Sequence, residues 1–303
     1  MKKQILNIIT YFDIFRYPIK KEELITLLKA EKNQLDLFLN ELISENICFK
    51  EDNYFSIQKE ISPLIKERIL KENNAKKYIQ KIPFFVKIMK RFPFVRGIAI
   101  SGSLSKGVMY KKGDIDYFII TAPNRLWITR TFLILFKKIF LLNSRKHFCV
   151  NYFVDENNLE IKDKNIFTAI EVSYLNPVYN NTLINKLKQT NNWSEQYIPN
   201  SIRVFETTEI NTKSNVRNFS EWIFKGALGE ILDKYFMKIT LKRWENKFSH
   251  FNKEKFELTM RTNRGISKHH PQDFQNKVLK EFSSRIKAKT EALTIQERIK
   301  EKA

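Results

Sequence analysis

Two short apolar segments constrain the fold of this chain more than any other feature. Residues 95–100 and residues 114–121 are both rich in apolar side chains, and a polar loop lies between them. Apolar runs of about four to eight residues between turn signals are typical of buried strands. Apolar residues at helical spacing precede them over residues 65–89 and follow them over residues 126–142. This alternation predicts an α/β arrangement of strands covered by helices.

The periodic pattern divides the chain into three regions. Residues 1–60 contain three helical patterns and then a hairpin signal, an order of elements that resembles a winged-helix unit. Residues 61–180 contain the α/β pattern, with a third strand expected at 147–154 and a further helix at 166–175. Residues 181–303 are expected to be mainly helical. We therefore expect a multidomain α+β or α/β protein, in which helices accompany a central mixed sheet.

The net charge is strongly positive and unevenly distributed. The chain has 54 Lys and Arg against 33 Asp and Glu, a formal net charge of +21. The first 60 residues carry 9 basic and 10 acidic side chains, residues 61–180 carry 21 and 9, and residues 181–303 carry 24 and 14. Such a field attracts polyanions: a nucleoside triphosphate, a nucleic acid or an anionic lipid surface. Charge alone does not choose among them, and a solvated Lys-rich surface explains it equally well.

The cysteine count and the most apolar window exclude further classes of protein. Cys48 and Cys149 are too few for a disulfide framework or a structural zinc site, which favours a reducing, cytoplasmic location. Three basic residues interrupt the most apolar window, at 126–142. We therefore expect a half-buried helix there and no membrane span.

The polar residues between the two apolar segments carry the clearest chemistry. The first segment is followed by Gly102 and Ser103, and Asp114 and Asp116 open the second. Residues two apart on a strand point to the same face, so the two carboxylates are expected side by side. Their repulsion costs stability unless cations or hydrogen bonds offset it. Mg²⁺ binds carboxylates together with phosphate oxygens, and this pair supplies such a set.

The turn before the aspartates has the composition of a phosphate site. Gly102 lacks a side chain, so backbone N–H groups can approach an anion closely. Ser103 offers a hydroxyl and is expected to begin a helix, whose N-terminus favours phosphate. Lys106, Lys111 and Lys112 lie between the turn and the aspartates, where they either hold a triphosphate or form a solvated loop.

These residues resemble the signature of the DNA polymerase beta nucleotidyltransferase superfamily. That signature is an apolar residue, Gly, then Gly or Ser, a short gap, and Asp-x-Asp or Asp-x-Glu within a strand. Gly102, Ser103, Asp114 and Asp116 match it in order and spacing. The resemblance implies an enzyme that transfers a nucleoside monophosphate from an NTP to an acceptor hydroxyl and releases pyrophosphate, with Mg²⁺ or Mn²⁺ as cofactor. The acceptor stays open: a small molecule, a protein or an RNA end.

The resemblance also implies roles for individual residues. Gly102 and Ser103 would hold the β- and γ-phosphates, with Lys106 as a further nucleotide contact. Asp114 and Asp116 would be the metal ligands and catalytic carboxylates. A third carboxylate on a neighbouring strand would complete the site and help to deprotonate the acceptor.

The sequence departs from the family pattern at this third carboxylate. The middle of the expected third strand carries Asn151, whose amide cannot act as a base. Asp155, four residues further on the same strand face, is our first choice for the missing catalytic acid. Glu171 is the second choice, and Glu160 and Asp163 are further candidates. The alternative is a degenerate, non-catalytic module that binds a nucleotide or a partner, and the departure from the pattern favours it.

Two other segments have competing interpretations. No Lys or Arg occurs in residues 33–46, which include the expected third helix and contain three acids. Phosphate contacts need cations, so we expect residues 1–60 to pack against other elements or dock a partner, not to recognise a DNA sequence. Residues 261–270 contain two Arg, one Lys and two His. They either contact the nucleotide or acceptor, or form a basic loop before a helix that starts at Pro271, and the sequence favours the loop.

Overall fold

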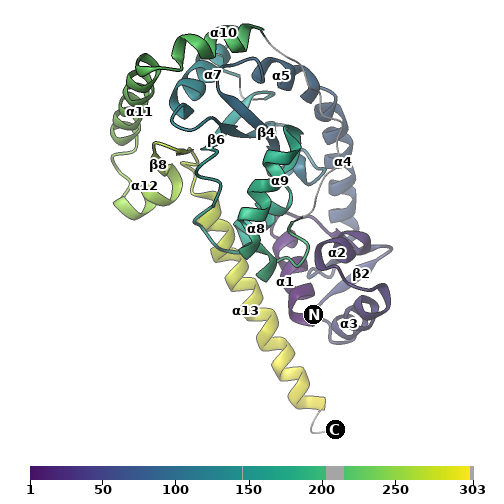
Figure 1. Ribbon diagram of the computed structural model, residues 1–303. Helices are drawn as coiled ribbons and strands as arrows, with labels where there is room; N and C mark the ends of the chain where they lie inside the picture. The colour runs from purple at the N-terminus through teal and green to yellow at the C-terminus, as the bar shows by residue number, and fades with distance from the viewer. Residues whose placement is uncertain (145, 203–214, 301–303) are drawn as a thin grey trace.

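A six-stranded mixed sheet lies at the centre of the computed structural model, which describes residues 1–144, 146–202 and 215–300 (Figure 1). In spatial order its strands are β7 (Asn176–Tyr179), β4 (Val95–Ser101), β5 (Asp116–Thr121), β6 (Cys149–Asp155), β9 (Ile266–Lys268) and β8 (Thr262–Asn263). Strands β5 and β6 are parallel, and the other neighbours are antiparallel. The expected mixed α/β class, with a sheet and many helices, is confirmed.

Helices cover both faces of this sheet, which explains why its central strands are almost continuously apolar. Ile98 and Ile119 belong to a core shared with α5 (Ile82–Met89) and α7 (Leu126–Phe140). Ala99 and Phe118, one position away on each strand, pack in a second core with α9 (Asn181–Thr190). Alternation along each strand therefore fills two separate cores.

The remaining helices of the central region follow the sequence pattern closely. The stretch expected to be helical before β4 is divided between α4 (Ser62–Ile79) and α5, and Pro83 lies in the first turn of α5. The short α6 (Gly102–Ser105) follows β4, and α8 (Ile166–Ser173) and the 3-10 helix η1 (Asn192–Gln196) follow β6. Helix α7 is half-buried, with Trp127 inside and Ile139 exposed. Among the described residues, none of the helices combines the length and apolar character needed to cross a bilayer.

The first region forms three helices and a small antiparallel sheet. Its elements are α1 (Lys2–Asp13), β1 (Ile19–Lys20), α2 (Lys21–Leu28), α3 (Lys32–Ser44), β2 (Phe49–Glu51) and β3 (Tyr54–Ser56), with strand order β1-β3-β2. Its apolar core continues into the rest of the protein, because Ile170 of α8 and Val278 of α13 (Phe274–Lys300) belong to the same cluster. This region is therefore packed into the molecule and does not stand apart from it.

The last region is mainly helical, as expected, but it also completes the central sheet. Its helices are α10 (Asn215–Phe224), α11 (Ala227–Lys247), α12 (Lys253–Met260) and the long α13. The sequence pattern gave no sign of β8 and β9, which lie between α12 and α13. Strand β9 pairs with β6, so Lys268 lies opposite Tyr152. The central sheet thus contains strands from both sides of the expected boundary at residue 180.

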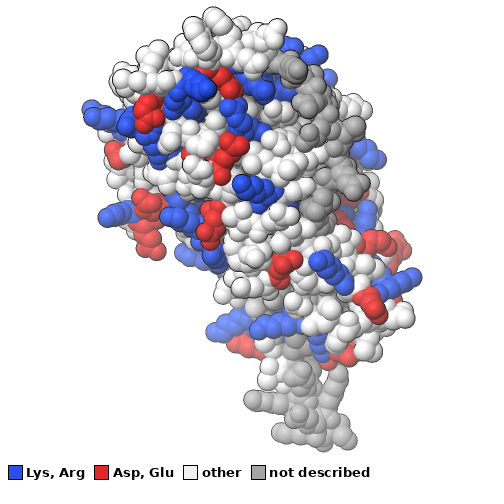
Figure 2. Space-filling view, in the orientation of Figure 1, with Lys and Arg blue, Asp and Glu red and all other residues white. Residues whose placement is uncertain are grey.

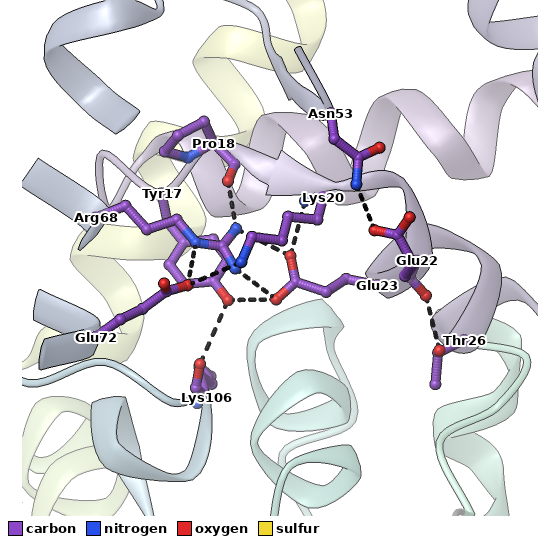
Figure 3. A network of polar contacts seen from close by, with 10 residues as sticks. All are labelled: Tyr17, Pro18, Lys20, Glu22, Glu23, Thr26, Asn53, Arg68, Glu72 and Lys106. Atoms are coloured by element: carbon purple, nitrogen blue, oxygen red, sulfur yellow. Dashed lines mark hydrogen bonds and ion pairs between the residues drawn. The ribbon is translucent and has the colours of Figure 1, made fainter. Parts of the chain in front are cut away.

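A buried arginine joins the first region to the central one (Figure 3). The side chain of Arg68, on α4, is only 3% exposed. Its Nη1 and Nη2 donate to the two carboxylate oxygens of Glu23, each at 2.9 Å, and its Nε donates to Glu72 Oε1 at 2.9 Å. The guanidinium also lies 3.9 Å from the centre of the Tyr17 ring. One cation therefore connects α4 to α2 and to the segment before β1.

This network extends to the turn that follows β4 (Figure 3). The Tyr17 hydroxyl donates to Glu23 Oε1 at 2.5 Å and lies 3.3 Å from the carbonyl oxygen of Lys106. Burial and the neighbouring Glu23 charge raise the pKa of Tyr17 far above its usual value. The hydroxyl therefore stays protonated and keeps its proton for hydrogen bonding.

We expect the Arg68→Met variant to lose about 2–4 kcal/mol of unfolding free energy, because two carboxylates would keep their positions without their shared cation. Both Glu23 and Glu72 are about a quarter exposed, so the loss should stay below that of a fully buried pair. Urea denaturation measures the change. The exposed Arg91→Met is the matched control and should stay within about 0.5 kcal/mol of the parent. Equal stability of the two variants would contradict this account of the network.

Candidate functional site

The turn after β4 and the start of β5 meet at the wall of a cavity of about 940 Å³. Ser101, the last residue of β4, pairs with Asp116, the first residue of β5. The antiparallel register therefore brings the turn and the aspartates together although ten residues separate Ser103 from Asp114 in the sequence. All four predicted residues of the motif, Gly102, Ser103, Asp114 and Asp116, line the cavity.

Gly102 is required at its position for two independent reasons. Its φ is +65°, a left-handed conformation that favours glycine. A Cβ atom there would also lie 2.6 Å from Oδ2 of Asp116, so the carboxylate would have to leave its position. The missing side chain thus lets the Asp116 carboxylate lie directly against the backbone of the turn.

The two aspartates share the cavity side of the chain. Ile115 and Tyr117, which alternate with them, are 0% and 1% exposed and belong to the core with α7. Strand β5 begins at Asp116, so Asp114 precedes the strand and is not part of it. The Ile115 N–H donates to the carbonyl oxygen of Lys146, and its carbonyl oxygen accepts from the N–H of Cys149 at the start of β6, which fixes the backbone between the two carboxylates.

The environment of Asp116 favours its protonated form. Burial is the main reason that its pKa rises to about 7, and the negative charges of Asp114 and Glu171 act in the same direction. A hydrogen bond with Cys149 and the positive charge of Lys106 oppose the shift. In the absence of a bound cation, the carboxylate pair is therefore only partly compensated.

Asn151 lies beside Asp116, where the third carboxylate was expected. Tyr117 pairs with Val150 and the next residue of β5 pairs with Tyr152, so Asn151 is the extra residue of a bulge in β6. Bulges redirect side chains, and here Nδ2 donates to Asp116 Oδ1 at 3.2 Å. The amide supplies a hydrogen-bond donor and no negative charge.

The acid that faces the cavity near the aspartates is Glu171, on α8. Its Oε1 accepts a hydrogen bond from Lys106 Nζ at 2.8 Å, and the same ammonium donates to the carbonyl oxygen of Gly102 at 3.0 Å. Both Lys106 and Glu171 line the cavity. The structure therefore places Lys106 against the turn and brings the second-choice acid with it.

Asp155, our first choice for the third acid, is not brought together with the pair. It lies at the far end of β6, opposite Thr121, whereas Asp116 lies opposite Cys149 at the near end. Its Oδ1 accepts hydrogen bonds from the Asn157 backbone at 3.1 Å and from Asn158 Nδ2 at 2.7 Å, and Asp155 does not line the cavity. Asp155 was chosen because it shares a strand face with Asn151. That was not sufficient to bring it to the aspartates, because the two residues are still four positions apart along the strand.

The other candidate acids have cations of their own. Glu160 is paired with Lys164 on the surface. Asp163 does line the cavity, but its two oxygens bind Arg261 at 2.8 Å and Lys268 at 2.9 Å. Neither acid is free to complete the set around Asp116 in this arrangement.

The basic cluster at residues 261–270 is closer to the site than the loop interpretation implies. Lys268 lies on β9, and Lys268, His269 and His270 line the cavity. Burial lowers the pKa of His270 to about 4, so its imidazole is neutral at pH 7. The sequence signal for this part of the site was the high density of polar residues in the segment. The interpretation that the segment contacts the nucleotide or acceptor was based on that density.

Part of the cavity wall has no local sequence signal. The segment between α1 and β1 contributes Phe15, Arg16 and Tyr17, and α13 contributes Phe274 and Val278. These residues come from opposite ends of the chain, so no motif or spacing connects them. The first region therefore forms part of the candidate site.

The donor set fits a hard divalent cation that arrives with a polyphosphate. Among residues 1–144, 146–202 and 215–300, no cluster of three or more His, Cys, Asp or Glu side chains is arranged to hold a metal ion by itself. Two neighbouring carboxylates together with phosphate oxygens are nevertheless a normal Mg²⁺ environment. Burial raises the pKa of Asp116 most, and the charges of Asp114 and Glu171 add to the shift; a bound cation would favour the ionised carboxylate against both effects.

Comparisons of the chain with family models, with curated protein sequences and with solved structures gave no significant match. The likeness to the nucleotidyltransferase superfamily therefore depends on the residues of the motif and on the chemistry around them. The chemistry of the cavity has to be argued from its own geometry.

Asp116 should make stability fall as the pH rises. Its pKa is about 7 in the folded chain and 3.8 as an ordinary carboxyl group, so between these values the folded state keeps a proton that the unfolded state has released. The free energy of unfolding should therefore decrease from about pH 4 to pH 7, by at most about 4 kcal/mol from this group. Urea denaturation at a series of pH values, with a chelator present, measures the slope.

The matched variants for this pH series are Asp116→Asn and Asp52→Asn. Asp52 is exposed in the turn between β2 and β3, so its replacement should leave the slope unchanged. Asp116→Asn should remove the decrease and be more stable than the parent at pH 8. A slope that persists in Asp116→Asn would mean that other groups cause it.

Proposed function

We propose that the chain is a Mg²⁺-dependent nucleotidyltransferase, which transfers a nucleoside monophosphate from an NTP to an acceptor hydroxyl and releases pyrophosphate. The observation that carries the proposal is the approach of Gly102 to Asp116, with Asp114 beside it, at the wall of a large cavity. The similarity of this motif to the DNA polymerase beta superfamily supports the reaction type. The assignment of the motif residues follows the same similarity.

Lysine side chains on the cavity wall are available contacts for a polyphosphate ligand. Lys71, Lys106, Lys112 and Lys268 all line the cavity. Three of these four lysines are paired with acids, so a polyphosphate would replace a carboxylate at each of them. Gly102 and Ser103 would accommodate the phosphates at the turn, where no side chain at position 102 blocks their approach.

The proposed chemistry divides between the cation and the protein. Mg²⁺ or Mn²⁺, when bound, would neutralise the polyphosphate and favour ionisation of the attacking hydroxyl. Asp114 and Asp116 would hold it, and Asp116 would ionise in its presence because an adjacent positive charge lowers a carboxyl pKa. Glu171 is the acid on the cavity wall that would accept the proton of the acceptor, after Lys106 exchanges its carboxylate for phosphate.

The first region is better suited to forming the cavity wall than to binding DNA. Its three helices and hairpin resemble a winged-helix unit in element order. Helix α3, which would correspond to the DNA-reading helix, has Lys32 as its first residue and no further Lys or Arg. Phe12, Phe15 and Tyr17 instead line the cavity. We propose that this unit helps to select the acceptor, whose chemical class remains a small molecule, a protein or an RNA end.

Asp114→Asn and Asp116→Asn should each abolish the Mg²⁺-dependent part of nucleotide binding. In the parent, calorimetric titration should give tighter NTP binding with Mg²⁺ than with chelator, since the carboxylates and phosphates share the cation. Transfer activity should fall by about 10³-fold or more in each variant, the loss of several kcal/mol of charge stabilisation. Asp155→Asn is the control: it lies outside the cavity and should keep the Mg²⁺ dependence. Metal-independent binding retained by both site variants would exclude the assignment.

A second function, a degenerate module that binds a nucleotide or partner without catalysis, is favoured by one contact. The Asn151 amide donates to Asp116 Oδ1, so this neighbour satisfies the carboxylate without adding charge for a second cation.

Asn151→Asp separates the two functions. The assay incubates the protein with each labelled NTP, Mg²⁺ or Mn²⁺, and cell extract, and follows labelling of an acceptor. The proposed enzyme should label an acceptor with Asn151 in place. An inactive parent that gains transfer activity in Asn151→Asp would identify a degenerate site. Without metal, the variant should also be less stable than the parent, because it adds a third acid beside Asp116.

A further inference from the structure

Helices α10 and α11 expose an outer apolar face. Large side chains on it are between 47% and 74% exposed, among them Phe219, Trp222, Leu228, Ile231, Tyr235 and Ile239. Scattered exposed apolar residues are normal, but a concentration of this kind along two consecutive helices marks an interaction surface. We refer to these six residues as the outer stripe.

The inner side of α11 already has its packing partners. Asp233 is fully buried and accepts hydrogen bonds from the backbone N–H groups of Trp127 and Ile128, at 2.8 and 3.0 Å. Trp244 is 5% exposed and contacts Trp127. The outer stripe on α11 runs through positions 228, 231, 235 and 239, a helical spacing that places its members on one face. A helix that is apolar on two faces is normally covered on both.

The charges around the outer stripe are mostly positive, although Glu230 pairs with Lys234 beside it. Of the charged side chains that the structure describes in residues 215–247, the exposed ones are six basic residues and one acid, Glu245. The basic residues are Lys225, Lys234, Lys238, Lys242, Arg243 and Lys247. In Figure 2 the surface over α10, at the top of the view, is mostly white, and blue side chains with a few red ones among them lie along the edge formed by α11.

We propose that the outer stripe of α10 and α11 binds the surface of a membrane that contains anionic lipids. Apolar and aromatic side chains on one face with Lys and Arg beside them are the pattern of helices that lie in the plane of the interface. The exposed Trp222 and Tyr235 are residue types that favour the headgroup level. The chain would lie on the bilayer without crossing it, and the proposal is independent of the transferase activity.

Two other occupants fit the surface less well. A second copy of the chain on a two-fold axis would bring equivalent basic residues towards each other, which costs energy. A nucleic acid would satisfy the Lys and Arg residues and could stack on aromatic rings, but it would leave Leu228, Ile231 and Ile239 without apolar partners. An anionic bilayer satisfies both the charge and the aliphatic side chains.

Flotation of the full chain with vesicles tests this proposal. We expect binding to vesicles of phosphatidylcholine with phosphatidylglycerol, little binding to phosphatidylcholine alone, and a steep loss with added salt. Trp222 is 74% exposed, whereas Trp127, Trp193 and Trp244 are buried. Vesicles with brominated acyl chains should therefore quench the emission of Trp222 and leave most of the remaining emission. Absence of binding to the anionic vesicles would overturn the proposal.

The charge variant is Lys238→Glu with Lys242→Glu, and its control is Lys162→Glu with Lys186→Glu. All four lysines are exposed, and both pairs change the net charge equally. Loss of one basic residue at the lipid surface corresponds to about fivefold in affinity, so the charge variant should bind at least about 25-fold more weakly. The control should stay within about threefold of the parent. Equal losses in the two pairs would show that only the overall charge matters and would overturn the assignment of this face.

The apolar variant Ile231→Ser with Tyr235→Ser distinguishes the occupants. Both side chains are more than half exposed, so the fold should be retained, as circular dichroism can verify. Vesicle affinity should fall at least about tenfold, whereas any affinity for a single-stranded RNA should be unchanged. Vesicle affinity that is unchanged in this variant would overturn the proposal in favour of a charge-only ligand. A parent dimer that this variant converts to monomers, with no vesicle binding by the parent, would identify a second copy as the occupant.

Discussion

The position of the candidate site depends on one buried cation. Moving a guanidinium out of water costs several kcal/mol unless carboxylates and hydrogen bonds compensate it. Arg68 has this compensation from Glu23, Glu72 and the face of Tyr17. The Tyr17 hydroxyl, whose single proton is shared between Glu23 and the carbonyl oxygen of Lys106, brings this network into contact with the turn that carries Gly102. A short loop between two strands would otherwise be free to move.

Once held in place, the turn forms a site whose electrostatics oppose folding. Asp114, Asp116 and Glu171 share one wall of the cavity, and Cys149, Lys106 and the amide of Asn151 compensate their negative charge only in part. Stability is commonly sacrificed in this way where a ligand has to supply the missing charge. The unfavourable charge therefore depends on the fixed scaffold, because a flexible turn would let the carboxylates move apart.

Local features of the fold were predictable from the sequence, and features made by distant contacts were not. The apolar segments and turn residues indicated β4, β5 and the motif at Gly102, because each depends on neighbours in sequence. The short β8 and β9 form only because β6 offers an edge. The same limit explains Asp155: strand periodicity gave its face but not the partners that hold it at the far end of β6. The bulge at Asn151 likewise arises from the pairing of β6 with β5, which is a contact between distant parts of the sequence.

The basic side chains in the cavity and those on α11 differ in whether they are paired with acids. Inside the cavity, Lys71, Lys106 and Lys268 are paired with Glu67, Glu171 and Asp163, each within 2.9 Å. On α11, Lys238 and Lys242 have no ion pair among the described residues, and they flank exposed apolar side chains. Cavity cations that already have acids nearby add little to the long-range field, whereas unpaired surface cations dominate it. The net charge, which is compatible with a nucleotide, a nucleic acid or an anionic lipid surface, is therefore better evidence about what the outer surface meets than about what the cavity binds.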